Sequence, residues 1–377
     1  MKGSFSLVLL IILLLFWALN YYIGLRGWQY LGSHIPYVSK ILYWSVFWLL
    51  AFSYILARVT SGYLPSFARK GISLIGGYWM AAMLYFILLI VLIDLFRLIL
   101  RWTSLMPRGT GINSPAALMW GISVFLLVAF ILAYGTWNAR TPVVNKYDNI
   151  AVNKKAGSLD QLHVVMASDV HLGSIMDRSR LTELVDMINR QNPDIVLLPG
   201  DILDDDVETF EKQKMWEVMS QIKSRYGTFA SLGNHEYISN RVDDAAAYLE
   251  KSGVQVLRDG YTLVNNSFYI VGRNDQAVER YTGKGRKPLA EILEGVDKSK
   301  PLLLMDHQPV RLDEAMANGI DLQVSGHTHR GQMFPNQFIT KRTFELDWGY
   351  LLKGSTHYIV SSGFGTWGPP IRTGQSP

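Results

Sequence analysis

The sequence predicts an α/β domain preceded by a four-helix transmembrane region, and three observations lead to this prediction. The first 137 residues contain four long apolar blocks, whereas the remainder has the composition of a soluble domain. From residue 162 onward, short apolar runs alternate with helix-like segments, which indicates a mostly parallel sheet. Asp, Asn or His follows five of these runs, where α/β folds place their sites. We therefore expect a membrane domain at residues 1–137, a linker at 138–161 and the α/β domain at 162–377.

The composition excludes several kinds of site. The 377 residues include no cysteine, so disulfides, thiolate zinc sites and cysteine nucleophiles are excluded. The net charge of +5 is modest and dispersed, without a basic stripe interleaved with aromatic residues. Nucleic acid is therefore not an expected partner.

Each apolar block is close to the ~20 residues that a membrane-spanning helix needs. The blocks run over residues 5–23, 41–57, 72–93 and 116–134. Trp and Tyr lie mostly toward the block ends, as in an interfacial aromatic belt. Four buried helices of a large soluble protein are the alternative, and they are disfavoured because each block is apolar all round. We expect a multi-pass protein of the cell membrane, with the lipid bilayer as a partner.

The orientation in the membrane stays open. An even number of spans places the N-terminus and the α/β domain on one side. Near the spans, that side carries six Lys or Arg residues and the other side five. The positive-inside rule does not decide between six and five.

The α/β domain should contain seven core strands and three longer helices. The strands are expected at 162–167, 194–198, 228–232, 268–271, 302–305, 322–325 and 358–361. The helices are expected at 178–190, 207–223 and 242–251. Asn265-Asn266 predicts a hairpin turn before Phe268.

The polar residues at the strand ends have the chemistry of a metal site. The stretches are Asp169-Val170-His171, Gly200-Asp201, Gly233-Asn234-His235-Glu236, Asp306-His307 and Gly326-His327-Thr328-His329. Oxygen and nitrogen ligands without cysteine suit two divalent ions, and a carboxylate such as Asp201 can bridge ions ~3.5–4 Å apart. Two such ions activate a shared water for attack on phosphorus. Each stretch alone could be a turn cap or a core histidine, but five in one domain disfavour that reading.

Taken in order, these stretches resemble the signature of the calcineurin-like metallophosphoesterases, and the membrane-anchored arrangement resembles the bacterial YkuE/YaeI-like phosphoesterases. The resemblance implies an αββα sandwich and two divalent ions drawn from Mn, Fe, Zn or Mg, with Mn favoured by the resemblance alone. It also implies the ligands: Asp169, His171, Asp201 and His329 for the first ion, and Asp201, Asn234, His307 and His327 for the second. By the same resemblance, His235 is a catalytic general acid or charge stabiliser and not a ligand.

The expected function is a membrane-anchored, dinuclear metal-dependent phosphoesterase. Its substrate would be a phosphomonoester or phosphodiester, with a lipid-linked or cell-envelope phosphate as one candidate. A phosphoesterase-fold binding module is an alternative, which the complete ligand set disfavours. A membrane sensor or transport protein with an appended phosphoesterase domain is another, and it would need more polar residues inside the spans. The oligomeric state is not indicated.

Three further sets of charged residues each allow an interpretation outside the main site. Asp204, Asp205 and Asp206 are expected to favour the N-terminus of the following helix, with an extension of the metal site as the alternative. The stretch 284–287, with Arg273 and Arg280 before it, is expected to be a solvated loop, with binding of an anionic substrate or lipid headgroup as the alternative. Asp94 and Arg97 are expected to form an interfacial anchor at the end of the third block.

Overall fold

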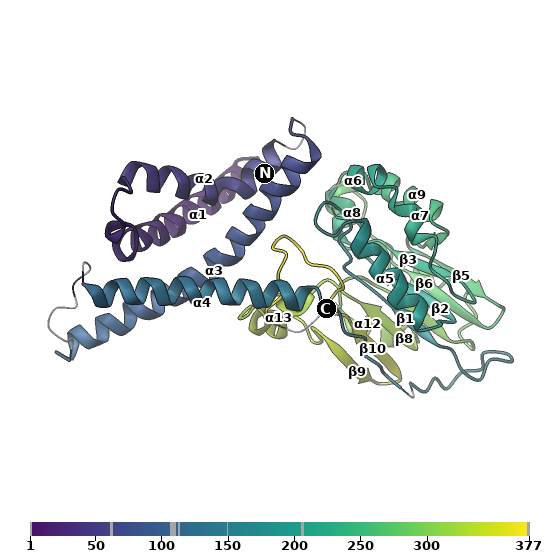
Figure 1. The fold of residues 1–377 in the computed structure, drawn as a ribbon. Helices are drawn as coiled ribbons and strands as arrows, with labels where there is room; N and C mark the ends of the chain where they lie inside the picture. The colour runs from purple at the N-terminus through teal and green to yellow at the C-terminus, as the bar shows by residue number, and fades with distance from the viewer. Residues whose placement is uncertain are drawn as a thin grey trace. The chain divides into compact units, whose positions relative to one another are not determined.

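The computed structural model describes residues 2–60, 63–105, 111, 114–148, 150–204 and 207–374 (Figure 1). The described chain divides into two compact units. The helical unit holds Met1–Trp137 together with Gly368–Ile371, and the α/β unit holds Asn138–Trp367 and Arg372–Pro377. Each unit is described by itself below.

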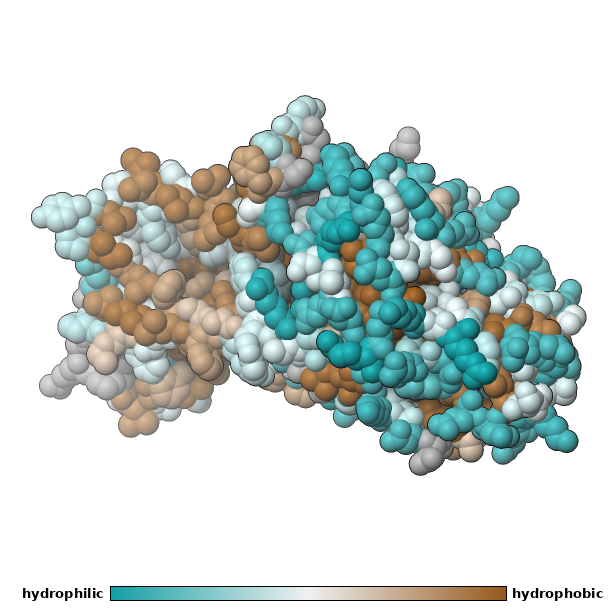
Figure 2. Space-filling view, turned by 45° about the vertical axis from the view of Figure 1, so that its right-hand side comes forward, coloured by the Kyte–Doolittle hydropathy of each residue, from teal (hydrophilic) through white to brown (hydrophobic). Residues whose placement is uncertain are grey.

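The helical unit consists mainly of four long helices. They are α1 (Lys2–Tyr30), α2 (Lys40–Val59), α3 (Ser66–Trp102) and α4 (Pro115–Ala139), with the short 3₁₀ helix η1 (Gly32–His34) between the first two. All four are long and apolar enough to cross a membrane. Hydrophobic residues cover much of this unit's surface in Figure 2, whereas hydrophilic residues dominate the α/β unit. Side chains that are apolar on all faces of a helix are typical of helices surrounded by lipid.

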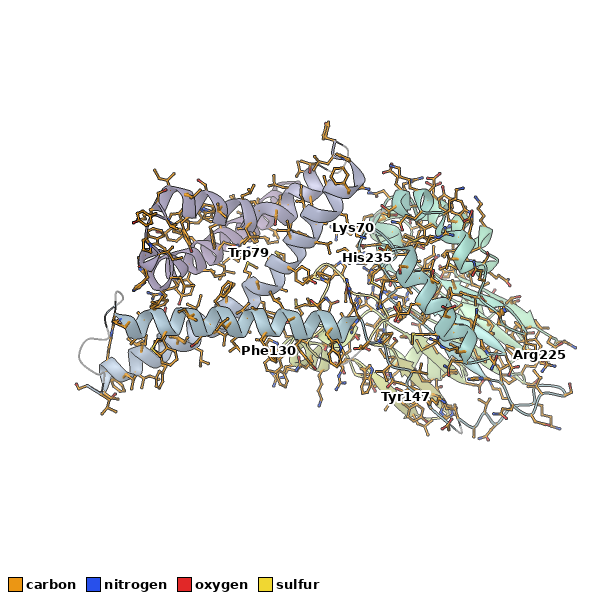
Figure 3. All side chains as sticks on the ribbon, in the orientation of Figure 1. Lys70, Trp79, Phe130, Tyr147, Arg225 and His235 are labelled. Carbon is orange, nitrogen blue, oxygen red and sulfur yellow. The ribbon has the colours of Figure 1, made fainter. Side chains whose placement is uncertain are left out.

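Polar contacts connect α1 to α3 inside this apolar unit. Trp79 of α3 donates its indole N–H to the Asn20 side-chain oxygen over 2.9 Å (Figure 3). Asp94 of α3 lies 2.6 Å from the Arg26 guanidinium and accepts a hydrogen bond from the Tyr22 hydroxyl over 2.6 Å. The residue expected at an interfacial anchor therefore belongs to an interhelical cluster, where polar side chains stabilise helix association in lipid.

The α/β unit contains two sheets. The first is entirely parallel, in the order β1-β2-β3-β4: β1 (Val164–Met166), β2 (Ile195–Pro199), β3 (Thr228–Ser231) and β4 (Val254–Val256). The second has the order β5-β6-β7-β8-β10-β9: β5 (Gly260–Val264), β6 (Phe268–Gly272), β7 (Leu302–Met305), β8 (Leu322–Ser325), β10 (Thr356–Val360) and β9 (Gly349–Lys353). Its inner strands β6, β7, β8 and β10 are parallel, and β5 and β9 pair antiparallel at the two edges. The predicted mostly parallel core is confirmed.

Helices cover the outer faces of the two stacked sheets. Ile195 and Leu197 of the first sheet pack with Ile270 and Leu303 of the second in one buried cluster. The first sheet is covered by α5 (Arg178–Arg190), α6 (Val207–Lys212), α7 (Met215–Met219), α8 (Asn234–Ile238), α9 (Val242–Lys251) and α10 (Ala277–Thr282). The second sheet is covered by α11 (Leu289–Ile292) and α12 (Leu312–Ala317). Burial on both faces explains why β2, β6 and β7 are continuous apolar runs. The unit is the predicted αββα metallophosphoesterase-like sandwich.

Local backbone conformation accounts for the differences from the predicted elements. The helix expected over 207–223 is two short helices, because Lys214 adopts a left-handed conformation (φ 49°) that an α-helix cannot continue through. Strands β4, β5 and β9 were not predicted; they lie at sheet edges, where polar residues interrupt the apolar pattern. The hairpin turn before Phe268 is confirmed, with Asn265 and Asn266 at positive φ between β5 and β6.

Candidate metal centre

The predicted site residues follow five parallel strands at the same edge of the two sheets. Asp169 and His171 come after β1, and Asp201 after β2. Asn234 and His235 begin α8 directly after β3 (Figure 3). The remaining three are His307 after β7 and His327 and His329 after β8. Parallel strands end at one edge of a sheet, so side chains far apart in sequence meet there.

The first cluster comprises Asp169, His171 and His329. One ligand atom from each residue lies within 4.8 Å of the others. The Nε2 atoms of His171 and His329 are 3.0 Å apart, and Nε2 of His329 is 3.5 Å from Oδ1 of Asp169.

The second cluster comprises Asp201, His307 and His327, again with ligand atoms within 4.8 Å of one another. Nε2 of His307 is 3.1 Å from Oδ2 of Asp201, and Nδ1 of His327 is 2.9 Å from the Asn234 side-chain oxygen. The same Asp201 oxygen is 3.9 Å from Nε2 of His171, in the first cluster. Asp201 therefore lies between the two clusters.

The donor set of both clusters fits divalent cations. It consists of carboxylate oxygens, an amide oxygen and imidazole nitrogens that face one another. Nε2 of His307 is buried, and its 3.1 Å approach to Oδ2 of Asp201 lacks the geometry of a hydrogen bond. Lone pairs that converge without a hydrogen-bond donor between them are stabilised by a cation, and this mixture of ligands is one that divalent transition metals and Mg²⁺ accept.

The backbone is strained where these side chains leave it. Asp169, His171, Asp201, His327 and His329 all have φ between 47° and 70°. The left-handed region is uncommon for residues with a Cβ and costs on the order of 1 kcal/mol or more each. Such strain is typical of functional sites, where the surrounding fold holds it.

Two glycines allow the backbone to approach the carboxylates. A Cβ at Gly233 would overlap the Asp201 carboxylate, and a Cβ at Gly326 would overlap that of Asp169. Gly200 turns sharply at φ 80° before Asp201. These three glycines therefore permit the close approach and the tight turn that bring the carboxylates into the site.

A buried carboxylate supports the loop that carries Asp201. Glu236 is fully buried and accepts hydrogen bonds from the backbone N–H groups of Asp201 (3.1 Å), Ile202 (2.7 Å) and Leu203 (2.9 Å). It also accepts one from Gly233 over 2.8 Å. Burial raises the pKa of Glu236, and the neighbouring Asp201 raises it further. Glu236 thus fixes the positions of two of the strand-end loops, a role that the sequence did not reveal.

Electrostatics keep two ligands, His329 and Asp201, in forms that can bind a metal. Burial and the neighbouring His171 hold the pKa of His329 well below its ordinary value, so this imidazole is neutral near pH 7. Burial raises the pKa of Asp201, but His307 lowers it by more, so Asp201 is a carboxylate. Metal binding requires these forms, because a protonated ligand has no lone pair to offer. Burial lowers the pKa of His307, but Asp201 raises it by more, to well above its ordinary value, so this imidazole must release a proton when a cation binds.

His235 lies beside the clusters and is held by Asp204. Its side chain is buried, and its Nδ1 is 3.0 Å from Oδ1 of Asp204. Its backbone N–H donates to Oδ1 of Asp201 over 2.9 Å. The Asp204 carboxylate is also 3.8 Å from Nδ1 of His171. Burial raises the pKa of Asp204, but the contacts with His171 and His235 bring it below its usual range.

The sequence interpretation of Asp204 is corrected by this geometry. We expected its charge to stabilise the N-terminus of the following helix. Its carboxylate instead contacts His235 beside the ligand clusters, as the alternative interpretation predicted. Asp205 and Asp206 lie outside the described residues.

A second feature that the sequence did not reveal is a buried arginine behind His329. The Arg372 guanidinium is fully buried and donates to the backbone oxygens of Gly365 (2.7 Å), Ser362 (2.8 Å) and His329 (3.2 Å). Burial lowers its pKa to about 10, so it stays charged near pH 7. Arg372 fixes the loop at the rear of the first cluster, although 43 residues separate it from His329.

The interpretation of the basic stretch at 284–287 is also corrected. Arg286 lies 2.8 Å from one oxygen of Asp306, and Arg273 lies 3.3 Å from the other. Arg273 also contacts Glu314 at 3.0 Å. Both guanidinium groups are largely buried, so the expectation of solvated arginines is wrong at these two positions.

Comparison with known proteins now identifies the class. The family model "Calcineurin-like phosphoesterase" matches residues 162–331. An uncharacterized metallophosphoesterase of Campylobacter jejuni is 32% identical over 282 residues, which cover 74% of this chain and 72% of that protein. The chain belongs to the calcineurin-like metallophosphoesterase family, and its class is that of metal-dependent phosphoric ester hydrolases.

Further relatives extend this comparison. A zebrafish "Transmembrane protein with metallophosphoesterase domain" is 29% identical over 301 residues, which cover 76% of this chain and 68% of that protein. YkuE of Bacillus subtilis, an uncharacterized metallophosphoesterase, is 25% identical over 220 residues, which cover 56% of this chain and 75% of that protein. A solved structure of TT1561 from Thermus thermophilus aligns at a TM-score of 0.36 with 12% identity, covering 54% of this chain and 91% of that one. The zebrafish relative and the four apolar helices together indicate membrane association.

Proposed function

We propose that this protein is a multi-pass membrane phosphoesterase that uses two divalent metal ions to hydrolyse a phosphomonoester or phosphodiester. The observation that carries the proposal is the position of Asp201. Its carboxylate is within 3.9 Å of imidazoles from both ligand clusters, as a residue shared by two ions would be. Two-metal hydrolytic sites use such a shared ligand to hold the ions ~3.5–4 Å apart.

The two clusters support the ligand assignment that the family resemblance implies. Asp169, His171, Asp201 and His329 would hold the first ion; Asp201, Asn234, His307 and His327 would hold the second. When bound, the ions would polarise the phosphate oxygens and make a water acidic enough to attack near neutral pH. Mn, Fe, Zn and Mg are the candidates, with Mn favoured by family resemblance only.

His235 would act on the leaving group. Its Nδ1 contact with the Asp204 carboxylate fixes the orientation of the ring. The backbone contact from His235 to Asp201 keeps the ring next to both clusters. The other ring nitrogen, Nε2, would then donate its proton to the departing oxygen. General acid catalysis of this kind contributes about 10²–10⁴-fold in rate.

The proposed substrate class rests on the membrane helices. Four apolar helices would keep the protein at a bilayer, which favours a lipid-linked or cell-envelope phosphate. A small soluble phosphoester is the alternative. The geometry favours an enzyme over a binding module, because every ligand position holds a side chain that can coordinate a metal.

The test uses the full-length protein in detergent. Metal is removed with a chelator, each candidate ion is added back, and bound metal is counted by mass spectrometry. We expect two equivalents per chain and metal-dependent hydrolysis of an aryl phosphate, either as monoester or diester. Full activity after metal removal would contradict the mechanism, and full activity with one equivalent would contradict its dinuclear form. Comparing the aryl esters with a phosphorylated lipid in mixed micelles then tests the substrate class.

A further inference from the structure

An exposed apolar and basic surface lies on the short helix α13 (Gln337–Thr343), which has no buried residue. Phe338 and Ile339 on this helix are 62% and 65% exposed, and Phe334 just before it is 48% exposed. Lys341 and Arg342 on the same helix are exposed as well. We call these five residues the α13 surface.

Such a surface is unusual for a helix of an α/β unit. The longest helix of this unit, α5, turns its large apolar residues inward, among them Leu181 and Leu184. On α13, two large apolar residues face outward beside two basic ones. Exposed aromatic and aliphatic side chains next to Lys and Arg are the combination by which short elements bind the interface of an anionic membrane.

A hollow lies against this surface. Its volume is about 340 Å³, and it is lined by Arg330, Gln337, Phe338, Lys341, Asp347 and Trp348. The Arg330 guanidinium lies over the Trp348 ring at 4.2 Å, and Asp347 accepts a hydrogen bond from the Thr340 hydroxyl over 2.7 Å. Two cationic side chains against one carboxylate give the hollow a net positive charge. It therefore suits an anionic group such as the phosphate of a lipid headgroup.

The α13 surface is attached to the metal centre through short contacts. The 3₁₀ helix η2 (His329–Gly331) contains both the proposed ligand His329 and Arg330 of the hollow. The Thr328 hydroxyl donates to the backbone oxygen of Asp347 over 2.6 Å. The ring of Phe344, directly after α13, meets the His327 ring edge-on at 6.1 Å. A partner bound at the α13 surface would therefore be adjacent to the ligands of both proposed ions.

We propose that the α13 surface binds an anionic lipid bilayer, with Phe334, Phe338 and Ile339 in the interface and a headgroup phosphate in the hollow. The positive charge of the surface and the four apolar helices of the same chain both favour lipid over another occupant. This contact goes beyond the proposed hydrolysis, because it holds whichever phosphoester is cleaved. A second copy of this chain or another protein would be a different occupant, and the experiment distinguishes these.

The absence of cysteine from the chain permits a direct test. Ile339→Cys carries an environment-sensitive fluorophore in the full-length protein, reconstituted in nanodiscs of anionic phospholipid with brominated acyl chains. Tyr261→Cys on β5, at a position that is 40% exposed, is the matched control. We expect a blue shift and bromine quenching at position 339 and neither at 261. Each basic side chain near an anionic surface is worth about fivefold in binding. The double variant Lys341→Glu/Arg342→Glu should therefore reduce the quenching at 339 to the control level.

Every other outcome overturns the proposal. Equal quenching at 339 and 261, or none at 339, would mean that the surface does not contact lipid. A blue shift at 339 without bromine quenching would indicate a protein occupant, and its dependence on protein concentration would identify a second copy. Hydrolysis of a water-soluble aryl phosphate is measured alongside. It should be unchanged in the charge-reversed protein, so a loss of lipid contact is not mistaken for damage to the metal centre.

Discussion

Two buried polar clusters begin at neighbouring residues after β7, and they differ in how their charge is balanced. Asp306 faces Arg273 and Arg286, and with Glu314 this ionic cluster holds two cations and two carboxylates. His307 faces Asp201 in the metal centre, whose members are carboxylates, imidazoles and an amide. The ionic cluster compensates its own charge, which indicates a structural role. In the metal centre, carboxylate oxygens, an amide oxygen and imidazole nitrogens converge on one another, and this difference is the physical reason to expect cations there.

Replacing Asp201, the proposed ligand of both ions, tests the difference between the two clusters most directly. Asp201→Asn keeps the size of the side chain but removes the charge that both proposed ions need. We expect activity near background and a lower metal content, a larger effect than loss of any single histidine. Asp186→Asn, the same exchange at an exposed position of α5, is the control. Near-normal turnover with two bound metals would show that Asp201 does not bridge.

The next largest effect should come from His235, which we place at the metal centre without ligating a metal. His235→Ala should retain both metals and lose about 10²–10⁴-fold in kcat. The loss should be smaller for an ester with a weakly basic leaving group, which needs little proton donation. Metal content and rates are measured with one good and one poor leaving group. Loss of one metal equivalent would instead make His235 a ligand.

A substitution in the ionic cluster should lower the free energy of unfolding. Asp306→Asn leaves two buried guanidinium groups without their shared carboxylate, and breaking a buried pair typically costs about 3–5 kcal/mol. Thermal unfolding in detergent measures the change. Asp313→Asn on α12 removes an ion pair with Lys353 at 2.7 Å from a side chain that is 72% exposed, and should change the free energy of unfolding by no more than about 1 kcal/mol. If Asp306→Asn proved as mild as this control, the ionic cluster would have no structural role.

The two clusters also differ in how far sequence predicts them. The proposed metal ligands were predictable because each follows one of five strands within a few residues, three of the seven directly after a glycine, and the fold then brings the strand ends together. The role of Arg372 was missed, and Asp204 was placed at the site only as an alternative, because their contacts are long-range: 31 residues separate Asp204 from His235. The ionic cluster was missed for the same reason. Arg286 lies in a basic stretch that the sequence predicts to be exposed to solvent, but it pairs with Asp306, 20 residues later. The αββα sandwich is confirmed, whereas the ligand roles and the membrane orientation stay predictions.

The smallest expected effect concerns the pH dependence of the ionic cluster. Burial raises the pKa of Glu314, but the Arg273 hydrogen bonds lower it by more, so the folded value lies below the ordinary one. A carboxyl whose pKa is depressed on folding stabilises the protein above its unfolded pKa, and this contribution disappears as pH falls through the folded value.

Glu314→Gln should therefore destabilise the protein near pH 7 by up to about 1 kcal/mol, as expected for a partly exposed pair. The difference from the wild type should shrink as pH falls below the ordinary Glu pKa near 4.5. Burial raises the pKa of Asp306 despite Arg286 and Arg273, so this group opposes the trend on the acid side and makes the wild-type profile shallower. Thermal unfolding of both proteins between pH 3 and 7 measures the profile. A constant difference across that range would mean that the charge of Glu314 contributes nothing, and the ionic cluster would then not be balanced as the geometry indicates.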